Sequence, residues 1–358
     1  MKIGLIGLPK SGKTTIFNAL TRSQAEVADY SSGRIEPNLA VVDVEDPRVD
    51  RLSSIYRPKK TVYATIDFID FVGVDRGEGK ELFSGTAMNL VKSADALAVV
   101  VRNFTNEVLD SSRGPADPSR DAEAVHGELL LSDLVLVETR LERIDADHQR
   151  GKKTPQSQAE QKVLQMLQEA LGGDTPIRDV DLNDDERRTI SGFQFLSQKP
   201  VMVIVNSDED RYGASADTVA RIGTDFPTVE FAGNFEMELS QLEAEEAAGF
   251  MEDMGISESA RSRLTRLAYE SLGLISFFTV GPDEVRAWTS RRGETAVDAA
   301  RAIHSDLARG FIRAECFTYE ALVAAGSEKG VKTQGQFRLE GKEYRVADGD
   351  ILNIRFSV

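Results

Sequence analysis

The sequence predicts an α/β protein in which a doubly wound, mostly parallel sheet carries an inserted helical hairpin and is followed by a C-terminal α+β domain. Three observations lead to this fold class. Before Leu274, short apolar runs alternate with helical segments, which is the pattern of a parallel sheet covered by helices. A long stretch with helical spacing interrupts this alternation. After Leu274, short strand-like runs surround one clear helix.

The first strand is an apolar run, Lys2–Gly7, which ends in a glycine-containing turn before the helical segment Lys13–Thr21. Alternating apolar residues make Thr61–Asp70 a half-buried strand. The other strands expected in the sheet are apolar runs between turn signals: Asn38–Val44, Leu97–Val101, Val201–Asn206 and Thr228–Ala232. Further helices are expected at Ser84–Ala94 and at about Ser257–Leu272.

The inserted stretch contains no proline from Asp121 to Asp147. Apolar residues there recur at spacings of four and three, which is typical of a seam between two packed helices: Leu130, Leu134, Val137, Leu141 and Ile144. A turn signal follows at Arg150–Pro155. The apolar spacing then continues at Leu164, Leu167 and Leu171. We therefore expect an antiparallel helical hairpin from Pro118 to about Ser191.

The C-terminal part mixes one helix, Ala296–Arg309, with short strands at Val285–Thr289, Ile312–Thr318 and Ile351–Phe356. A chain of 358 residues exceeds the size at which single hydrophobic cores stop growing. We therefore expect three parts: an α/β domain of residues 1–117 and 192–273, the hairpin of residues 118–191, and an α+β domain of residues 274–358.

The formal net charge is −16, and the acidic excess lies before Leu274, because the remainder carries as many basic as acidic residues. Such a surface argues against general affinity for free DNA, although it leaves room for a local basic patch. The single cysteine, Cys316, excludes a disulfide framework and a cysteine-built metal site. No apolar run has the length of a membrane span or signal peptide, so a cytoplasmic protein without a membrane partner is expected.

The turn after the first strand, Gly7–Thr14, fits the phosphate-binding pattern G-x-x-x-x-G-K-[ST]. Its glycines let successive backbone N–H groups surround phosphate oxygens, and the following helix directs its positive end at the same anion. Lys13 is expected to act on the β- and γ-phosphates, and the Thr14 hydroxyl to ligate Mg²⁺. The sequence therefore predicts a P-loop NTPase whose loop contacts a nucleoside triphosphate through Leu8, Pro9, Lys10, Ser11, Gly12, Lys13, Thr14 and Thr15.

Asp70-Phe71-Val72-Gly73 lies at the end of the expected strand Thr61–Asp70. A carboxylate at this place can hold Mg²⁺ through water, and the amide of Gly73 can meet the γ-phosphate. Asp70 is therefore a candidate metal ligand, and Gly73 is a candidate catalytic residue.

The base-reading segment is expected directly after the strand Val201–Asn206, at Asn206-Ser207-Asp208-Glu209. GTPases read guanine there with Asn-Lys-x-Asp, whose Asp carboxylate pairs with two donors of the base. Glu209 is one methylene longer, which misplaces the carboxylate for guanine and favours ATP, while GTP stays open. Ala232 and Gly233 are expected to supply backbone contacts to the base.

These motifs resemble those of the YchF family of Obg-like ATPases over nearly the whole chain. The matching stretches are the P-loop, Ile35–Asn38, Asp46–Arg48, Asp70–Gly73, Asn206–Glu209, Phe278–Trp288, Ile303–Ala314 and Leu339–Asp350. The resemblance implies a P-loop domain of the translation-factor class, a coiled-coil insertion, a C-terminal TGS domain with a β-grasp fold, use of ATP in preference to GTP, and association with the ribosome.

The chain departs from the family at Lys10, at Arg34 and in the loop Val74–Gly79, which is shorter than the family's glycine-rich loop. The family usually has Asn where Lys10 stands, in a loop that supports a catalytic K⁺ ion. Lys10 either replaces part of that cation's charge or points into solvent. Arg34 stands where a switch threonine ligates Mg²⁺, and it either acts as an arginine finger or marks a loop that does not close in the usual way. Val74 stands where many GTPases have a water-orienting Gln. The family also has an apolar residue there, so catalysis does not rest on this side chain and slow turnover is expected.

Two groups of basic residues are candidate contacts for ribosomal RNA. They are the hairpin tip from Arg150 to Lys153 and the arginines Arg286, Arg291 and Arg292. A solvated charged face is the alternative for the arginines. Together these features predict a slow ATP-binding and ATP-hydrolysing switch associated with the ribosome. The alternatives are a nucleotide-sensing module with negligible hydrolysis and a GTPase.

Overall fold

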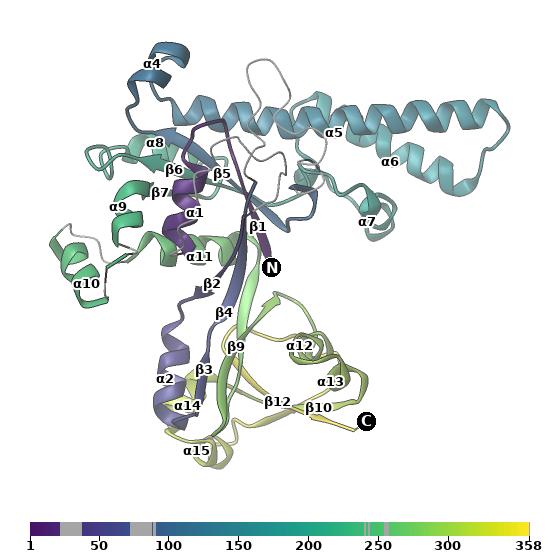
Figure 1. Cartoon of the computed structure of the whole chain (residues 1–358). Helices are drawn as coiled ribbons and strands as arrows, with labels where there is room; N and C mark the ends of the chain where they lie inside the picture. The colour runs from purple at the N-terminus through teal and green to yellow at the C-terminus, as the bar shows by residue number, and fades with distance from the viewer. Residues whose placement is uncertain are drawn as a thin grey trace. The chain divides into compact units, whose positions relative to one another are not determined.

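The computed structural model describes residues 1–21, 38–71, 88, 91–239, 241–242, 244–253 and 258–357. Its contacts divide the chain into two units, one of residues 1–40 and 67–261 and one of residues 41–66 and 262–358. Figure 1 gives the course of the chain and the names of the elements. The candidate residues Arg34 and Gly73, the residue Val74 and most of the expected helix Ser84–Ala94 lie outside the described residues.

The first sheet has six strands in the order β2-β4-β1-β5-β6-β7. Their bounds are Asn38–Val44 for β2, Ala64–Asp70 for β4, Lys2–Ile6 for β1, Ala96–Asn103 for β5, Val201–Ser207 for β6 and Thr228–Ala232 for β7. From β4 to β7 every neighbouring pair is parallel. Every residue of β5 is buried, as expected of an inner strand covered on both faces. The predicted doubly wound, mostly parallel sheet is confirmed.

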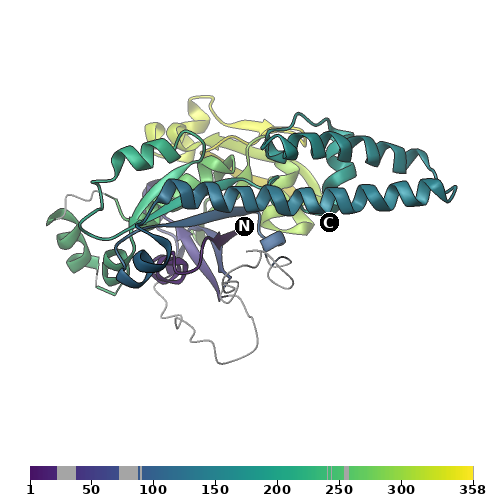
Figure 2. The ribbon, with the colours of Figure 1, turned by 90° about the horizontal axis from the view of Figure 1, so that it is seen from above.

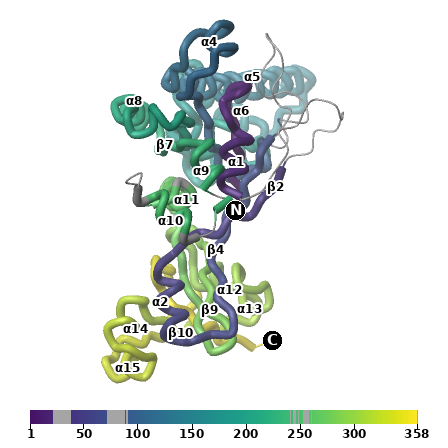
Figure 3. Tube along the Cα trace, turned by 60° about the vertical axis from the view of Figure 1, so that its left-hand side comes forward, coloured from purple at the N-terminus to yellow at the C-terminus, as the bar shows by residue number. Residues whose placement is uncertain are grey.

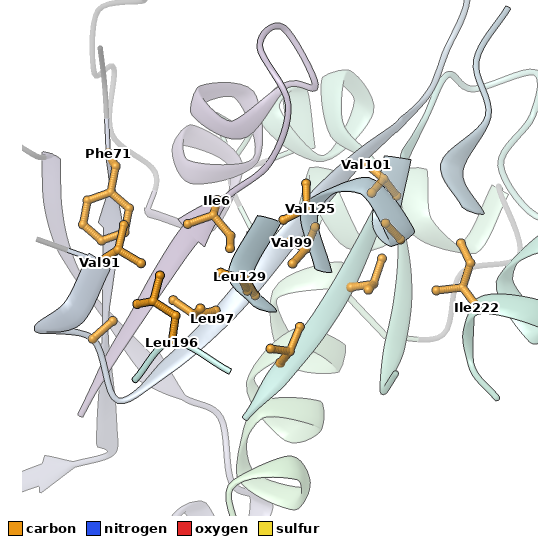
Figure 4. Close-up of a cluster of buried hydrophobic side chains, with 14 of the residues drawn as sticks. Ile6, Phe71, Val91, Leu97, Val99, Val101, Val125, Leu129, Leu196 and Ile222 are labelled. Atoms are coloured by element: carbon orange, nitrogen blue, oxygen red, sulfur yellow. The ribbon is translucent and has the colours of Figure 1, made fainter. Parts of the chain in front are cut away.

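The helix α5, Pro118–Gln149, begins where the sequence favours a helix start. The side chain of Asp117 accepts a hydrogen bond from the backbone N–H of Arg120, and Pro118 occupies the first turn. The N-terminal half of α5 covers one face of the sheet. Val125 and Leu129 pack there against Leu97 and Val99 of β5, whose side chains share a face because strand residues alternate (Figure 4).

Further helices of this unit follow the strands: α1 at Lys13–Thr21, α4 at Glu107–Arg113, α8 at Ala216–Ile222, α9 at Gly233–Leu239 and α10 at Ala244–Asp253. The helix α1 packs against β1 and α9, and α9 packs against β7 (Figure 3). The helix α11, Ala260–Ser271, leads from this unit into the second.

The second half of α5 pairs with α6, Pro155–Gly172, in a long hairpin (Figure 2). Thr154 and Ser157 form a reciprocal capping box at the start of α6. Among the expected seam residues, Leu130, Val137, Leu141, Ile144, Leu164, Leu167 and Leu171 are buried in one cluster, and Leu134 packs against it. Two short 3-10 turns, Ile177–Asp179 and Ser191–Phe193, and the helix α7, Asp184–Ile190, complete this part.

A buried carboxylate fixes the hairpin to the segment before β6. Asp133 of α5 accepts hydrogen bonds from the backbone N–H groups of Leu196, at 2.9 Å, and Ser197, at 2.7 Å. Burial raises the pKa of Asp133, while the two N–H groups act in the opposite direction. A buried carboxylate with two backbone donors defines one position for α5 along this segment.

The second unit is built on a sheet in the order β11-β10-β12-β8-β9-β3. The strands are β3 at Lys60–Val62, β8 at Leu274–Thr279, β9 at Glu284–Arg291, β10 at Phe311–Thr318, β11 at Arg338–Glu340 and β12 at Asp350–Phe356. Its helices are α2 at Pro47–Tyr56, α12 at Ala296–Ile303, α13 at Ser305–Arg309, α14 at Tyr319–Ala325 and α15 at Glu328–Thr333. Cys316 is fully buried in its core, where burial raises the pKa of the thiol to about 12. The expected α+β character is confirmed.

Two expected elements are wrong in their extent. The run Thr61–Asp70 forms two strands in different sheets, because β3 pairs with β9 while β4 pairs with β1. An alternating pattern defines a buried face but does not name the partner strand. The expected helix Ala296–Arg309 breaks at His304, whose extended backbone and Nδ1 atom cap α13 by accepting a hydrogen bond from the N–H of Asp306.

The helix α2 had no counterpart among the expected elements, although its start carries a clear signal. Asp46 caps the N–H of Arg48, and Pro47 follows it directly. Arg48 also forms an ion pair with Asp348, at 2.7 Å, and its guanidinium lies 5.1 Å from the ring centre of Phe278. These contacts attach α2 to the C-terminal strands of the second unit.

Within the described ranges, no helix is both long enough and apolar enough to span a membrane.

Candidate functional site

The candidate site lies where parallel strands of the first sheet end. The turn after β1 contains three residues with positive φ: Gly7 at 150°, Lys10 at 61° and Gly12 at 94°. A side chain on Gly7 would place its Cβ 2.3 Å from the carbonyl oxygen of Val100 in β5. Only glycine therefore fits where the loop leaves β1 and passes over the neighbouring strand.

Lys10 adopts the left-handed conformation without being glycine, and its side chain is exposed. This conformation costs an ordinary L-residue about 1 kcal/mol. The surrounding loop therefore imposes the conformation on Lys10, while its amine remains accessible to solvent and ligands.

Lys13, at the start of α1, is a buried lysine whose amine reaches back over the loop. Its Nζ atom donates to the carbonyl oxygens of Gly7, at 3.2 Å, and Leu8, at 3.1 Å. The hydroxyl of Ser11 is buried and has no hydrogen-bond partner among the described residues. An ammonium group and an unsatisfied hydroxyl in one loop fit an anion with several oxygen atoms.

Thr14, in the first turn of α1, contacts Asp70 at the end of β4. The Thr14 hydroxyl donates to Oδ2 of Asp70 at 3.0 Å, and Asp70 is the fully buried last residue of β4. A hydroxyl and a carboxylate beside a phosphate loop are the hard oxygen ligands that Mg²⁺ prefers. The donor set at this position therefore fits Mg²⁺.

Asn206, at the end of β6, lies against the phosphate loop. Its Nδ2 atom donates to the carbonyl oxygen of Ser11 at 3.0 Å. A Cβ on Gly12 would lie 2.0 Å from that nitrogen, and a Cβ on Gly233 would lie 2.5 Å from the Oδ1 atom of Asn206. The amide of Asn206 thus fits between two glycines, one in the loop and one at the start of α9.

Beyond Asn206 lies a pocket of about 250 Å³, lined by Ser207, Asp208, Glu209, Asp210, Ala232, Asn234 and Phe235. Glu209 is exposed at its edge. The Asp208 carboxylate is already occupied by backbone donors, because it accepts from the N–H groups of Thr105, at 3.0 Å, and Arg211, at 3.2 Å. Glu209 is therefore the carboxylate better placed to meet a ligand.

Sequence reasoning missed a buried polar network behind this pocket. Ser207 donates to Glu230 at 2.5 Å, and Glu230 accepts from the N–H of Gly213 at 3.1 Å. The amide of Asn103 donates to Ser207 and Ser215, each at 2.8 Å. Polar residues that end the apolar strands β5 and β6 were the signal for this network. It fixes the wall of the pocket.

The structure brings the described candidate residues to one edge of the sheet. The residues from Leu8 to Thr15 follow β1, and Asp70 ends β4. Asn206 lies at the end of β6 and Glu209 just after it, while Ala232 ends β7 and Gly233 follows it. Because the carboxyl ends of parallel strands share an edge, these distant sequence segments meet there.

Two family models match this chain. Residues 2–139 match the model described as "50S ribosome-binding GTPase". Residues 274–357 match the model YchF-GTPase_C, which is described as "Protein of unknown function (DUF933)". The two matches cover the phosphate loop and the C-terminal strands respectively.

Relatives with established names align over the full length. The Ribosome-binding ATPase YchF of Bacillus subtilis (strain 168) is 37% identical, with 99% of each chain covered. The protein of the same name from Escherichia coli O157:H7 is 36% identical over 100% of this chain and 99% of its own. Among solved structures, the Schizosaccharomyces pombe YchF GTPase has a TM-score of 0.84 at 31% identity, covering 99% of this chain and 97% of that one.

Proposed function

The chain belongs to the YchF family, and on that premise we propose that it is an ATP-binding and ATP-hydrolysing switch protein that associates with the ribosome. The observation that carries the proposal is the meeting of a phosphate loop, an Mg²⁺-compatible Thr14–Asp70 pair and a base pocket at one sheet edge. Such an edge is where open α/β sheets bind nucleotides.

The P-loop residues provide the phosphate contacts. The Lys13 amine leaves its loop carbonyls to meet the β- and γ-phosphate oxygens, and Ser11 finds a partner for its buried hydroxyl there. Thr14 and Asp70 would hold Mg²⁺, which supplies positive charge to the oxygens of the transferred phosphoryl group. This assignment accounts for the buried Lys13 and the unsatisfied Ser11 hydroxyl of the loop, and for the buried carboxylate of Asp70 at the end of β4.

The base pocket favours adenine over guanine. Guanine presents two neighbouring donors that the shorter aspartate of a GTPase accepts together, and Glu209 carries its carboxylate one methylene further out. The amide of Asn206 and the backbone at Ala232 and Gly233 complete the base contacts. A site that lacks a correctly placed acceptor loses the hydrogen bonds that select guanine.

Replacing Glu209 by Asp is expected to raise the affinity for GTP relative to ATP by about tenfold, the value of one hydrogen bond to a charged group. Competition between the two nucleotides for the purified protein measures this ratio. Asp217→Glu, the same kind of change in an exposed acid of α8 that does not line the pocket, is the control and should leave the ratio unchanged. If Glu209→Asp left the ratio of GTP to ATP affinity unchanged, Glu209 would not contribute to the choice of base.

We propose that ATP hydrolysis is slow because of the residues expected near the γ-phosphate. Val74 cannot polarise the attacking water, so hydrolysis depends on charge and on positioning. Gly73 would contribute its amide to the γ-phosphate. Arg34 would act in cis as an arginine finger, an assignment that unchanged turnover of Arg34→Ala would contradict.

The exposed Lys10 amine takes over part of the role of a monovalent cation at the phosphates. ATP hydrolysis is therefore expected to change less than about twofold when K⁺ is replaced by Na⁺, since a fixed ammonium group supplies the charge. Lys10→Asn, which places the usual family residue in the left-handed position, should make hydrolysis depend on K⁺. Strong K⁺ dependence of the unmodified protein would contradict this role.

Two basic surfaces support contact with ribosomal RNA in a cytoplasmic setting. Arg150, Lys152 and Lys153 are exposed at the tip of the hairpin of residues 118–191. In the second unit, the Arg286 guanidinium lies 4.2 Å from the ring centre of Trp288. Arginine and lysine beside an aromatic ring can meet both the RNA backbone and its bases. The hairpin and the TGS-like residues 274–358 would transmit the nucleotide state to the ribosome.

Co-sedimentation with ribosomes tests this function. More protein is expected to pellet with ribosomes in ATP and Mg²⁺ than in ADP. The reason is that ATP would order the loops near Arg34 and Val74, and the hairpin and the C-terminal part would pass this change on to the ribosome. Charge reversal of Lys152 and Lys153 should reduce the pelleted fraction severalfold. Reversal of Lys162, exposed on α6 away from the tip, is the matched control. Equal amounts with both nucleotides would contradict a switch.

A further inference from the structure

The short helix α4 carries an arginine to the phosphate loop. Arg113, its last residue, donates from Nη1 to the carbonyl oxygen of Pro9 at 3.1 Å. The two residues are more than a hundred positions apart in sequence, and both belong to the first unit. No phosphate-binding pattern includes Arg113, and the function proposed above does not use it.

Helix α4 is firmly held in place. The buried Arg102 of β5 forms an ion pair with Asp110 of α4 at 2.7 Å and donates to the carbonyl oxygen of Gly114 at 3.0 Å. Asn106 caps the helix start through the N–H of Leu109, and Leu109 is buried. The hydrogen bond from Arg102 lowers the pKa of Asp110, which favours the ionised carboxylate. Both ends of the helix that carries Arg113 are therefore anchored.

The bond to Pro9 fixes the orientation of one peptide plane. A trans peptide is planar, so its C=O and the following N–H point in opposite directions. Holding the Pro9 carbonyl toward Arg113 therefore holds the Lys10 N–H toward the other side of the loop. Lys10 is also the loop's non-glycine residue with positive φ, so this peptide has an accessible alternative in which it flips.

We propose that Arg113 is a positioning residue that locks the Pro9–Lys10 peptide, so that the Lys10 N–H is presented to the phosphates of the nucleotide. The proposal rests on nucleotide binding by the P-loop. Arg113 does not itself need to touch the nucleotide. Arg113 holds the Lys10 N–H in its binding orientation before the nucleotide arrives. The entropic cost of ordering this donor is then not paid on binding, so the affinity for the nucleotide is higher.

The test compares Arg113→Met, which keeps an unbranched stem but removes the donor, with Arg113→Lys, which restores a donor and the charge. The full chain is titrated with ATP and with ADP in Mg²⁺. Arg113→Met is expected to weaken ATP binding about tenfold, with an unchanged melting temperature because Arg113 is exposed. Arg113→Lys should recover most of the affinity. Arg143→Met, in an exposed arginine of α5 outside the site, should behave as the unmodified protein.

Repeating the titrations at about 0.5 M NaCl separates a hydrogen bond from a long-range charge effect, because salt screens the latter. The proposal predicts that the deficit of Arg113→Met persists at high salt. A deficit that vanishes there, an ATP affinity equal to that of the unmodified protein, or a loss of affinity that merely follows a lower melting temperature would overturn it. If the unmodified chain itself fails to bind ATP, the proposed function fails, and this inference fails with it.

Discussion

Replacing Lys13 by Met is expected to weaken ATP binding by at least about 100-fold and to remove measurable hydrolysis. The Lys13 amine is the buried cation of the phosphate loop, and it now rests on two carbonyl oxygens that are weaker partners than phosphate. Two lost charge-assisted hydrogen bonds are worth about 3 kcal/mol, which corresponds to that factor. Isothermal titration and a steady-state assay of phosphate release measure the two effects.

The matched control for this prediction is Lys162→Met. Lys162 is an exposed lysine of α6, so its removal changes net charge equally but leaves the site intact. Both variants should fold, which far-ultraviolet circular dichroism checks. If Lys13→Met bound ATP as tightly as Lys162→Met, the phosphate loop would not be the nucleotide site.

Gly12→Ala is the second change with a large expected effect, and its cause is steric. Gly12 has a φ of 94°, and an added Cβ would lie 2.0 Å from Nδ2 of Asn206. Asn206 is buried and fits tightly against Gly233, so it cannot move away without losing its bond to the carbonyl oxygen of Ser11. The phosphate loop and Asn206 would both be displaced. We expect loss of detectable ATP binding and a stability lower by about 2 to 4 kcal/mol.

Gly127→Ala serves as the comparison. Gly127 lies within α5, and nothing lies within 4 Å of an added Cβ there. The glycine-to-alanine change at this position should therefore leave ATP binding unchanged and stabilise the helix by about 0.5 to 1 kcal/mol. Thermal denaturation and ATP titration of both variants give the answer. Equal behaviour of the two alanine variants would show that Asn206 does not fit against the loop as described.

The phosphate loop could be predicted because its signal is local. Strand, turn and helix are consecutive in sequence, and the glycines at positions 7 and 12 occupy backbone conformations that the structure requires. The position of Asn206 beside the phosphate loop could be predicted as well, because Asn206 lies at the end of an apolar strand. Parallel strands then bring it to the edge where β1 ends.

What could not be predicted depends on partners far away in sequence. The division of Thr61–Asp70 into β3 and β4 is decided by β9 and β1, which the alternating pattern does not name. Glu230 is a charged residue within an apolar strand, and its role appears only when Ser207 and Gly213 approach it. Nothing in the sequence around Arg113 indicates its contact with the carbonyl oxygen of Pro9, which depends on where α4 lies in the fold.

The most direct test of a YchF-family ATP switch is titration of the unmodified full-length protein with ATP and with GTP, each with and without Mg²⁺. Single-turnover hydrolysis is then measured for the nucleotide that binds more tightly. We predict tighter binding of ATP than of GTP, stronger binding with Mg²⁺, and slow but measurable release of phosphate. Tighter binding of GTP, or tight ATP binding with no phosphate release, would contradict the account.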